Sequence, residues 1–343
     1  MDQRQAWKHL TAVTRPGLRL APPTYLDDIR SNLRANGMPE AVAAHDTAAL
    51  FDWLVGVSQF QGISDRNAIA FTAKNGLVGW DDIDGALEAD PCCPRLQNYW
   101  VFSGCGYRKG TGTFAEPRHI RRCSLPTHPT RKGSLIQAAY ALFLFIRDVC
   151  DGDLIDWIDR HLADADPGPE MPDRAVRMGA ALTEPLTHIY GFGQKIWAFA
   201  LSDLLLAADP NRERWVATGA GIIVVDTLLH NHLHRTGTLR RFHAEHAYEP
   251  RCYARNGCAD ILRGLADRID ACEFNPAFPA CFPRFVQFAV WRFCSNVCNG
   301  NRIDDRDRCG NALCPAIAHC DRVALHPSGY GENRPDNSAG SGK

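Results

Sequence analysis

The chain has 343 residues, with 38 Lys and Arg against 39 Asp and Glu, a formal net charge of −1, and 45% hydrophobic residues. This composition suits a globular protein of one large domain or two, and it excludes a disordered chain, a collagen-like repeat and a strongly basic chromatin protein. The longest uncharged apolar run, Ala138–Ile146, is too short to span a bilayer, so we expect no membrane partner. No apolar leader follows Met1, which favours the cytoplasm, where clustered cysteines bind metals more often than they form disulfides.

Apolar residues at helical spacing predict an almost entirely helical protein. Ala48–Phe60 carries a wide apolar stripe, and Ser134–Val149 is apolar on nearly every side, which predicts a buried core helix. The pattern predicts further helices over Leu154–Leu162, Lys195–Ala208, Cys258–Ala271 and Pro283–Val297. Strand alternation is scarce, so the predicted fold class is all-α.

The segment 91–134 differs from the rest of the chain in its charge. It holds eight Lys and Arg against a single acid, Glu116. Its Gly, Pro and Thr content predicts a long loop or irregular subdomain, in which cations such as Arg121 and Arg122 face phosphates. The alternative is a solvated insertion without a role. Its cysteines and histidines match no metal-binding spacing, and we interpret them as scattered: Cys92, Cys93, Cys105, His119, Cys123 and His128.

Two short segments in the second half of the chain have a pattern suited to chemistry. Gly191 and Gly193 separate two apolar stretches just before Lys195. A tight helix–Gly-x-Gly–helix turn presents backbone N–H groups at a helix N-terminus, where a phosphate oxygen can bind. Further on, the apolar run Ile222–Val225 leads into Asp226. An acid in that setting suits a helix N-cap, a catalytic carboxylate, or both.

These segments resemble the helix-hairpin-helix DNA glycosylases of the endonuclease III type. Ile189–Ala198 is similar to the family's hairpin L-P-G-V-G-R-K-T-A, and Val225–Gly237 is similar to V-D-T-H-V-x-R-x-x-x-R-T-G, with no gap. Phe51–Asp65 looks like the family's helix that ends in S-x-Q-x-T-D. Leu228 and Asn231 depart from the family, which has His and Arg there. The likeness covers about residues 48–322 apart from the basic insertion.

The resemblance implies an all-α, two-lobed fold. Residues 48–218 would form a six-helix barrel lobe with the hairpin, and 1–47 plus 219–325 would form a second lobe with a cysteine cluster, leaving 326–343 as a disordered tail. The active site would be the cleft between the lobes, and a base in a duplex must flip out to reach it. Gln61 would fill the gap left in the duplex, or it is only a polar residue at a helix end.

The resemblance also assigns roles to two residues. Asp226 would be the catalytic carboxylate, which stabilises positive charge on the sugar or activates water. Lys195 aligns with the lysine nucleophile of the members that also cut the strand, although it could instead only contact phosphate. The separation between these two residues is longer than in the family. We expect the extra segment, Asp209–Gly219, to be a loop.

Cysteines crowd toward the end of the chain. Cys298, Cys309, Cys314 and Cys320 resemble the C-x6-C-x2-C-x5-C ligands of a [4Fe–4S] cluster, although only the last spacing matches. Zinc takes the same ligands, and Cys294 is an alternative to Cys298. We interpret the preceding cysteines as plain buried thiols: Cys252, Cys258, Cys272 and Cys281. The nearby histidines are interpreted as surface or phosphate-contacting residues: His230, His232, His234, His243 and His246.

The expected function is that of a monomeric DNA glycosylase acting on double-stranded DNA. Its substrate would be a hypermodified cytosine of phage DNA, in defence, or an oxidised or mismatched base, in repair. The alternative is a non-catalytic helix-hairpin-helix DNA-binding protein with a structural metal. A two-metal nuclease is not favoured, because the sequence has no compact Asp, Glu and His set.

Overall fold

The computed structural model is helical over most of its described length, which confirms the all-α prediction. Two-residue strands, β1 (Tyr107–Arg108) and β2 (Thr113–Phe114), pair antiparallel. Among the described helices, none combines the length and the apolar character needed to cross a membrane. The structure describes residues 3–60, 65–89, 93–105, 107–108, 113–114, 124–125, 128, 134–248, 250–294 and 313–325.

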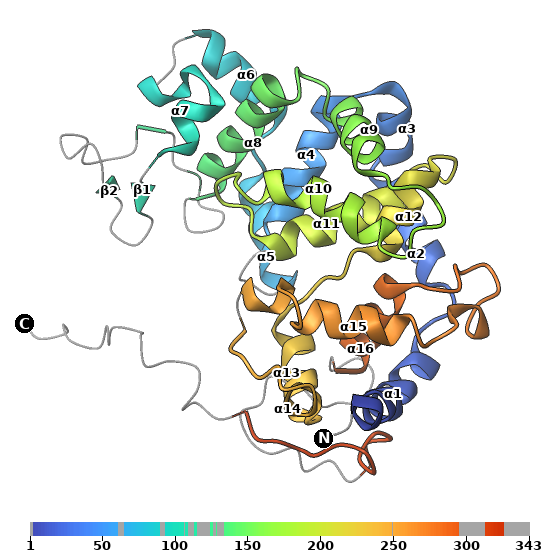
Figure 1. Ribbon diagram of the computed structural model, residues 1–343. Helices are drawn as coiled ribbons and strands as arrows, with labels where there is room; N and C mark the ends of the chain where they lie inside the picture. Colours follow the sequence, from blue (N-terminus) through green and yellow to red (C-terminus); the bar gives the residue numbers. More distant parts are fainter. Residues whose placement is uncertain are drawn as a thin grey trace, which may run out of the picture. The chain divides into compact units, whose positions relative to one another are not determined.

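The chain folds as two compact units (Figure 1). The first joins Met1–Tyr25 to Ile223–Lys343, and the second is the continuous stretch Leu26–Ile222. The second unit contains the segment 48–218, for which the resemblance implies a barrel lobe, and the first contains Asp226 and the C-terminal cysteines. The barrel arrangement itself remains a prediction, and the expected tail 326–343 lies outside the described residues.

The second unit is built around α8 (Leu135–Val149), which is buried from its first residue through Ile146. The rings of Phe143 and of Phe51 on α4 (Thr47–Ser58) meet in a T-shaped pair, as do those of Phe145 and of Trp157 on α9 (Leu154–Ala165). Apolar residues on different sides of α8 thus meet other helices. The other helices of this unit are α2 (Tyr25–Ala35), α3 (Met38–Ala44), α4 (Thr47–Ser58), α5 (Asp65–Asn75), α6 (Trp80–Ala89), α7 (Tyr99–Ser103), α9 (Leu154–Ala165), α10 (Arg174–Leu186), α11 (Gln194–Ala207) and α12 (Glu213–Gly221), with a 3₁₀ turn η1 (Pro94–Gln97).

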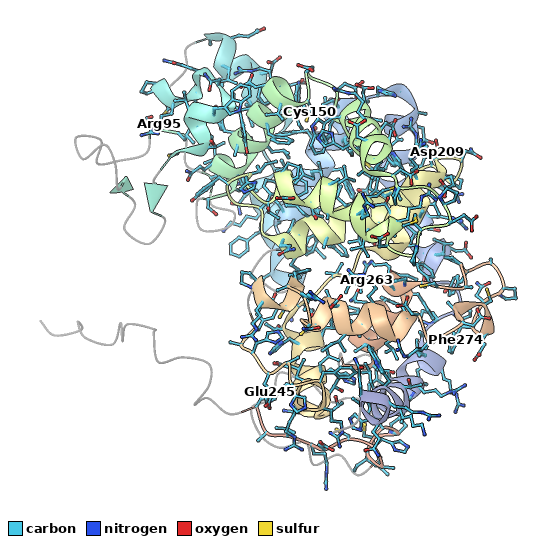
Figure 2. The ribbon with its side chains drawn as sticks, viewed as in Figure 1. Arg95, Cys150, Asp209, Glu245, Arg263 and Phe274 are labelled. Atoms are coloured by element: carbon cyan, nitrogen blue, oxygen red, sulfur yellow. The ribbon has the colours of Figure 1, made fainter. Side chains whose placement is uncertain are left out.

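The expectation of a loop over Asp209–Gly219 was wrong. Only the turn that begins at Asp209 (Figure 2) is irregular, and α12 follows it. Trp215 is buried in this helix, and its indole N–H donates to Asp159 Oδ1 at 2.6 Å. A Cβ at Gly219 would lie 2.5 Å from the backbone N of Leu206, so glycine lets α12 approach α11 closely. Because α12 packs through small and polar residues, its sequence has no apolar stripe from which a helix could be predicted.

The first unit packs α1 (Gln3–Leu20) and α16 (Pro283–Cys294) against each other. A Cβ at Gly17 would meet Phe293 Cβ at 3.0 Å, which shows how closely the two helices approach. The segment 313–325 joins this unit through Val323 N, which donates to Arg235 O at 2.8 Å. The remaining elements are α13 (Thr227–Arg235), α14 (Thr238–Arg241), η3 (Pro250–Tyr253), α15 (Cys258–Ala266) and η4 (Ala271–Glu273).

The predicted helix boundaries hold within a few residues except at one end. The helix predicted over Cys258–Ala271 ends at Ala266, because Asp270 caps a separate 3₁₀ turn by accepting from Cys272 N. The helix predicted over Pro283–Val297 is α16, whose described part ends at Cys294.

Candidate functional site

Asp226 is fixed by contacts to both of its carboxylate oxygens. It is the N-cap of α13, where Oδ1 accepts from Leu229 N at 2.9 Å. Its Oδ2 accepts from the indole N–H of Trp291, on α16, also at 2.9 Å. A helix cap needs only the first of these bonds. The second is a tertiary contact that sets the orientation of the half-buried carboxylate.

The residue before Asp226 is held by two tyrosines. Val225 N donates to Tyr253 Oη at 3.0 Å, and Val225 O accepts from the hydroxyls of Tyr253 at 3.2 Å and Tyr248 at 3.4 Å. Burial, followed by the charge of Asp226, raises the pKa of Tyr248 to about 12. Burial also raises the pKa of Tyr253. Both phenols therefore stay protonated and keep these hydrogen bonds across the physiological pH range.

The same segment gathers two histidines and two cysteines. The ligand atoms of His230, His246, Cys252 and Cys258 all lie within 4.8 Å of one another, and the group could hold a metal ion. His230 is on α13, one turn after Asp226, and Cys258 begins α15. His246 and Cys252 come from the loop and 3₁₀ turn between α14 and α15. The exposed Glu245, labelled in Figure 2, directly precedes His246 in the chain.

The interpretation of these histidines as surface or phosphate-contacting groups was wrong for two of them. His230 and His232 are buried, so neither faces a phosphate at the surface, and burial lowers the pKa of His232 to about 4. The interpretation of the cysteines as plain buried thiols was also wrong in part. Cys281 is exposed and Cys272 is half-buried. Cys252 and Cys258 are buried as predicted, and they lie beside imidazole nitrogens. The four residues lie on several elements, so the spacing along a single helix does not reveal the group.

The predicted hairpin is α10, a turn over 187–193, and α11. Gly191 has a φ of +83°, and a Cβ there would lie 2.6 Å from Ala138 Cβ on α8. Both the backbone conformation and the close packing therefore require glycine at this position. Gly193 is the N-cap of α11. Phe192 stacks on Trp197 with ring centroids 4.9 Å apart, which fixes the turn on the helix that follows.

Lys195 is the second residue of α11, and its side chain is half-buried. Within the described part of the chain, no acid forms an ion pair with its ammonium group. Lys195 belongs to the second unit and Asp226 to the first. A shared active-site cleft for the two residues therefore remains a prediction.

Several predicted site residues lie outside the described residues: Gln61, Arg121, Arg122, Cys298 and Cys309. The two remaining cysteines of the C-terminal run, Cys314 and Cys320, are half-buried thiols, and Cys320 Sγ lies 3.8 Å from Arg235 O. The interpretation of the cysteines in 91–134 as scattered also stays untested, because Cys92 and Cys123 are not described.

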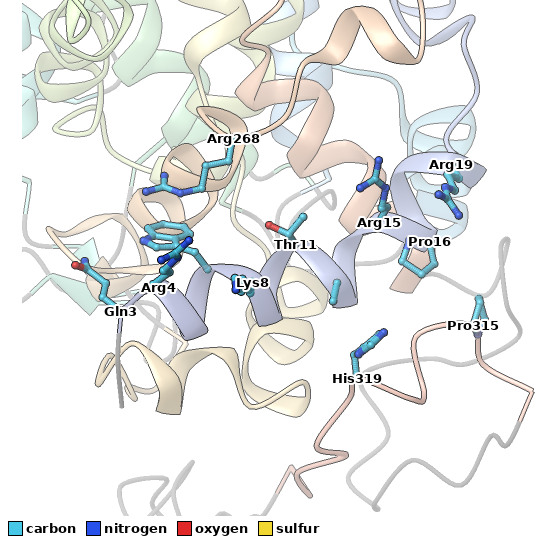
Figure 3. Close-up of a pocket in the computed structure, with 12 residues that line it drawn as sticks. Gln3, Arg4, Lys8, Thr11, Arg15, Pro16, Arg19, Arg268, Pro315 and His319 are labelled. Atoms are coloured by element: carbon cyan, nitrogen blue, oxygen red, sulfur yellow. The ribbon is translucent and has the colours of Figure 1, made fainter.

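A basic groove runs along α1 in the first unit (Figure 3). Its volume is about 980 Å³, and its lining has five Arg and Lys side chains and no acid: Arg4, Lys8, Arg15, Arg19 and Arg268. The Arg268 guanidinium lies 4.0 Å from the ring centroid of Trp7. Sequence reasoning missed this groove. The signal was present, because Arg4, Lys8, Arg15 and Arg19 repeat at helical spacing along one face.

No family model, curated protein or solved structure matches the chain. The resemblance of the sequence to helix-hairpin-helix glycosylases therefore stays a prediction.

Proposed function

We propose that this chain is a DNA glycosylase with a helix-hairpin-helix, in which Asp226 is the catalytic carboxylate. The observation that carries the proposal is the pair of bonds to Asp226, one from the start of α13 and one from Trp291 Nε1. An ordinary N-cap has no need of an indole donor from another helix. A carboxylate that must face a charge developing at one point in space does need a fixed orientation.

The chemistry follows from the charge that bond cleavage creates. When the N-glycosidic bond breaks, the bonding electrons leave with the base and positive charge builds on the sugar. A carboxylate held at fixed angle stabilises that charge without having to reorganise. In the simplest version, Asp226 also accepts a proton from the water that attacks C1′, and the product is an abasic site.

Lys195 gives the proposal a second version. Its amine would attack C1′ in place of water, and the resulting Schiff base would lead to strand cleavage. Its position two residues into α11, after a glycine turn, also suits a simple phosphate contact. The two roles differ in one product, a covalent amine adduct that borohydride can trap.

Double-stranded DNA is the proposed partner. The hairpin would bind the phosphate backbone through N–H groups at the N-terminus of α11, and the basic groove of α1 would bind it through charge. The proposed C-terminal metal is a [4Fe–4S] cluster on Cys298, Cys309, Cys314 and Cys320, with zinc as the alternative. Iron analysis and the visible absorption of the purified protein separate these two.

The test of catalysis is Asp226→Asn, assayed by alkali-revealed abasic sites on duplexes carrying oxidised pyrimidines, mismatched adenine or hypermodified cytosines. Asn is as good an N-cap as Asp, but it has a single acceptor oxygen, so it keeps the bond from Leu229 N and loses the one from Trp291. We expect the free energy of unfolding to fall by about 1–2 kcal/mol. Excision should fall by about 10³-fold or more while DNA binding persists. Asp46→Asn is the matched control, because Asp46 is also an N-cap that accepts from the residue three positions on.

The possible outcomes are distinct. Full excision by the Asp226→Asn protein removes Asp226 from catalysis. An adduct that is absent in Lys195→Ala establishes the lyase version, whereas abasic sites without an adduct leave Lys195 as a DNA contact. DNA binding with no product on any duplex supports the alternative, a non-catalytic binding protein.

The test of the basic groove is the double variant Lys8→Gln, Arg19→Gln. Each cation that no longer binds a phosphate should lower the slope of log affinity against log salt by about 0.9, so the double variant should lower it by about 1.8. The control is Arg34→Gln, Lys74→Gln, which removes the same charges from exposed positions in the second unit. Equal slopes for both double variants would remove α1 from the DNA-binding surface.

A further inference from the structure

The His230, His246, Cys252 and Cys258 side chains converge with the spacing of ligands around one ion. His230 Nδ1 lies 3.3 Å from Cys258 Sγ and 3.5 Å from Cys252 Sγ. Cys258 Sγ lies 3.5 Å from His246 Nε2. The two imidazole centroids are 5.1 Å apart. Two thiols and two imidazoles at this proximity, with His230, Cys252 and Cys258 buried, form a group of uncommon composition for a protein core.

We propose that these four residues bind one Zn²⁺ ion in a closed structural site, independent of the glycosylase proposal. A tetrahedral Zn²⁺ with bonds of about 2.3 Å to sulfur and 2.05 Å to nitrogen holds those ligands about 3.5 Å apart. The three nitrogen–sulfur distances here are 3.3, 3.5 and 3.5 Å. Two soft sulfur and two imidazole ligands in that arrangement select zinc over magnesium or calcium.

The size of the group excludes an iron–sulfur cluster at this position. A cluster with two histidines and two cysteines binds the histidines through one iron and the cysteines through another. The iron and sulfide atoms would then separate the nitrogen ligands from the sulfur ligands. In this group nitrogen and sulfur are adjacent, and no pair of the four ligand atoms exceeds 4.8 Å.

A backbone contact selects the nitrogen that His246 presents. Its Nδ1 lies 2.6 Å from Ala244 O, a distance at which Nδ1–H donates and Nε2 keeps its lone pair. Histidine ligands of zinc usually have such a partner, because it fixes both the tautomer and the ring orientation.

The site would connect the loop between α14 and α15 to α13. That loop also provides Tyr248 and Tyr253, the two residues that hold Val225 just before Asp226. His230 itself lies one helical turn after Asp226, and its backbone N–H donates to the backbone carbonyl of Asp226 at 3.1 Å. With four protein ligands the ion has no open position for water, so its role is to hold this segment together and not to carry out a reaction.

The test is the metal content of the full-length protein, measured by elemental analysis without DNA. We expect about one zinc per chain from this site in addition to any iron, and loss of that zinc in Cys258→Ser. Cys281→Ser and His243→Asn, which change exposed residues of the same types, should keep it. Cys314→Ser is the second control, because it removes a thiol of the C-terminal run.

Three results would overturn the proposal. Zinc that is absent from Cys314→Ser but kept in Cys258→Ser would belong to the C-terminal cysteines. A zinc-free protein with two fewer titratable thiols would indicate a Cys252–Cys258 disulfide. A zinc-free protein with all its thiols would indicate a polar cluster without metal. Each result is independent of base excision, so it leaves the proposed function to its own test.

A second measurement covers the case in which Cys258→Ser does not fold. In the Co²⁺-substituted wild-type protein, the site should give the visible spectrum of a tetrahedral ion with two thiolates. His246→Cys should keep one metal per chain and move that spectrum toward three thiolates, because cysteine is also a zinc ligand. An unchanged spectrum in the His246→Cys protein would remove His246 from the ligand set.

Discussion

The Asp226 segment, residues 222–258, and the α10–α11 hairpin hold their candidate functional residues in opposite ways. In the Asp226 segment the side chain is fixed, since both carboxylate oxygens accept from donors on different helices. In the hairpin it is the backbone that is fixed. Gly191 is packed on α8, whereas Lys195 is half-buried with no described ion-pair partner. A carboxylate that stabilises charge must be preorganised, but an amine on a flexible stem can move to its target.

The largest loss of stability is expected at Gly257, in the turn between Cys252 and Cys258. A Cβ there would lie 2.3 Å from Arg251 O and 2.8 Å from Cys252 O, and neither backbone atom can move aside. We expect Gly257→Ala to lower the free energy of unfolding by about 3 kcal/mol or more, measured in urea.

Gly85→Ala is the control for that substitution. Nothing lies within 4 Å of a Cβ at Gly85, which is inside α6, so alanine should stabilise the protein by about 0.5–1 kcal/mol. If Gly257→Ala unfolds like the wild type, the turn does not pack as described and the Asp226 segment is not rigidly held.

The next effect concerns the hairpin. Gly191→Ala should lower the free energy of unfolding by about 2–3 kcal/mol, because it combines a φ of +83° with a Cβ 2.6 Å from that of Ala138. In the Ala138→Gly background, Gly191→Ala should cost only the backbone part, about 1–2 kcal/mol. A double-mutant cycle with no coupling would mean that the turn does not rest on α8.

The sequence predicted the parts of the fold that depend on local pattern. The apolar residues of 134–149 predict α8 almost to the residue, and the apolar run before Asp226 predicts its cap. It did not predict α12, whose stability comes from the burial of Trp215 and the close approach at Gly219. Both of these depend on a partner helix that no local window contains.

The metal group was missed for a related reason. His230, His246, Cys252 and Cys258 are separated by 16, 6 and 6 positions, which is neither a helical repeat nor a compact finger spacing. They meet because α13, the loop after α14, η3 and α15 converge. The turn that contains Gly257 connects η3 to α15. The equal spacing of the last three residues was the one local signal.

A smaller effect tests whether the Asp226 side chain is positioned as its bonds suggest. Trp291→Phe keeps an aromatic, smaller side chain and removes the N–H that donates to Oδ2. We expect kcat for base excision to fall about tenfold with KM unchanged, which corresponds to about 1.4 kcal/mol in the transition state. Trp100→Phe, at a tryptophan that is 63% exposed, is the control and should change neither constant. A loss confined to KM would make Trp291 a binding residue.

The smallest effect is expected from acid, and it concerns the attachment of the hairpin to its unit. Arg174, the first residue of α10, donates to Asp166 at 2.7 and 2.8 Å and to Glu213 of α12 at 2.5 and 2.7 Å. The Arg174 guanidinium lowers the pKa of both carboxyls. A folded-state pKa below the unfolded value, about 3.9 for Asp and 4.3 for Glu, stabilises the fold above that value. This stabilisation is lost as the pH falls through the folded-state pKa.

The melting temperature of the second unit should therefore fall by a few degrees as the pH drops from 5 toward 3. Arg174→Gln should lower it already at pH 7 and flatten that fall, because both carboxyls lose the cation that lowers their pKa most, and only Asp166 keeps a hydrogen bond to Arg214. Arg177→Gln, an exposed arginine of the same helix, should leave the pH dependence of the wild type. If the two variants show the same acid profile, Arg174 does not anchor α10 through charge. The hairpin would then depend on Gly191 and the apolar core alone, and its contrast with the multiply bonded Asp226 segment would be sharper.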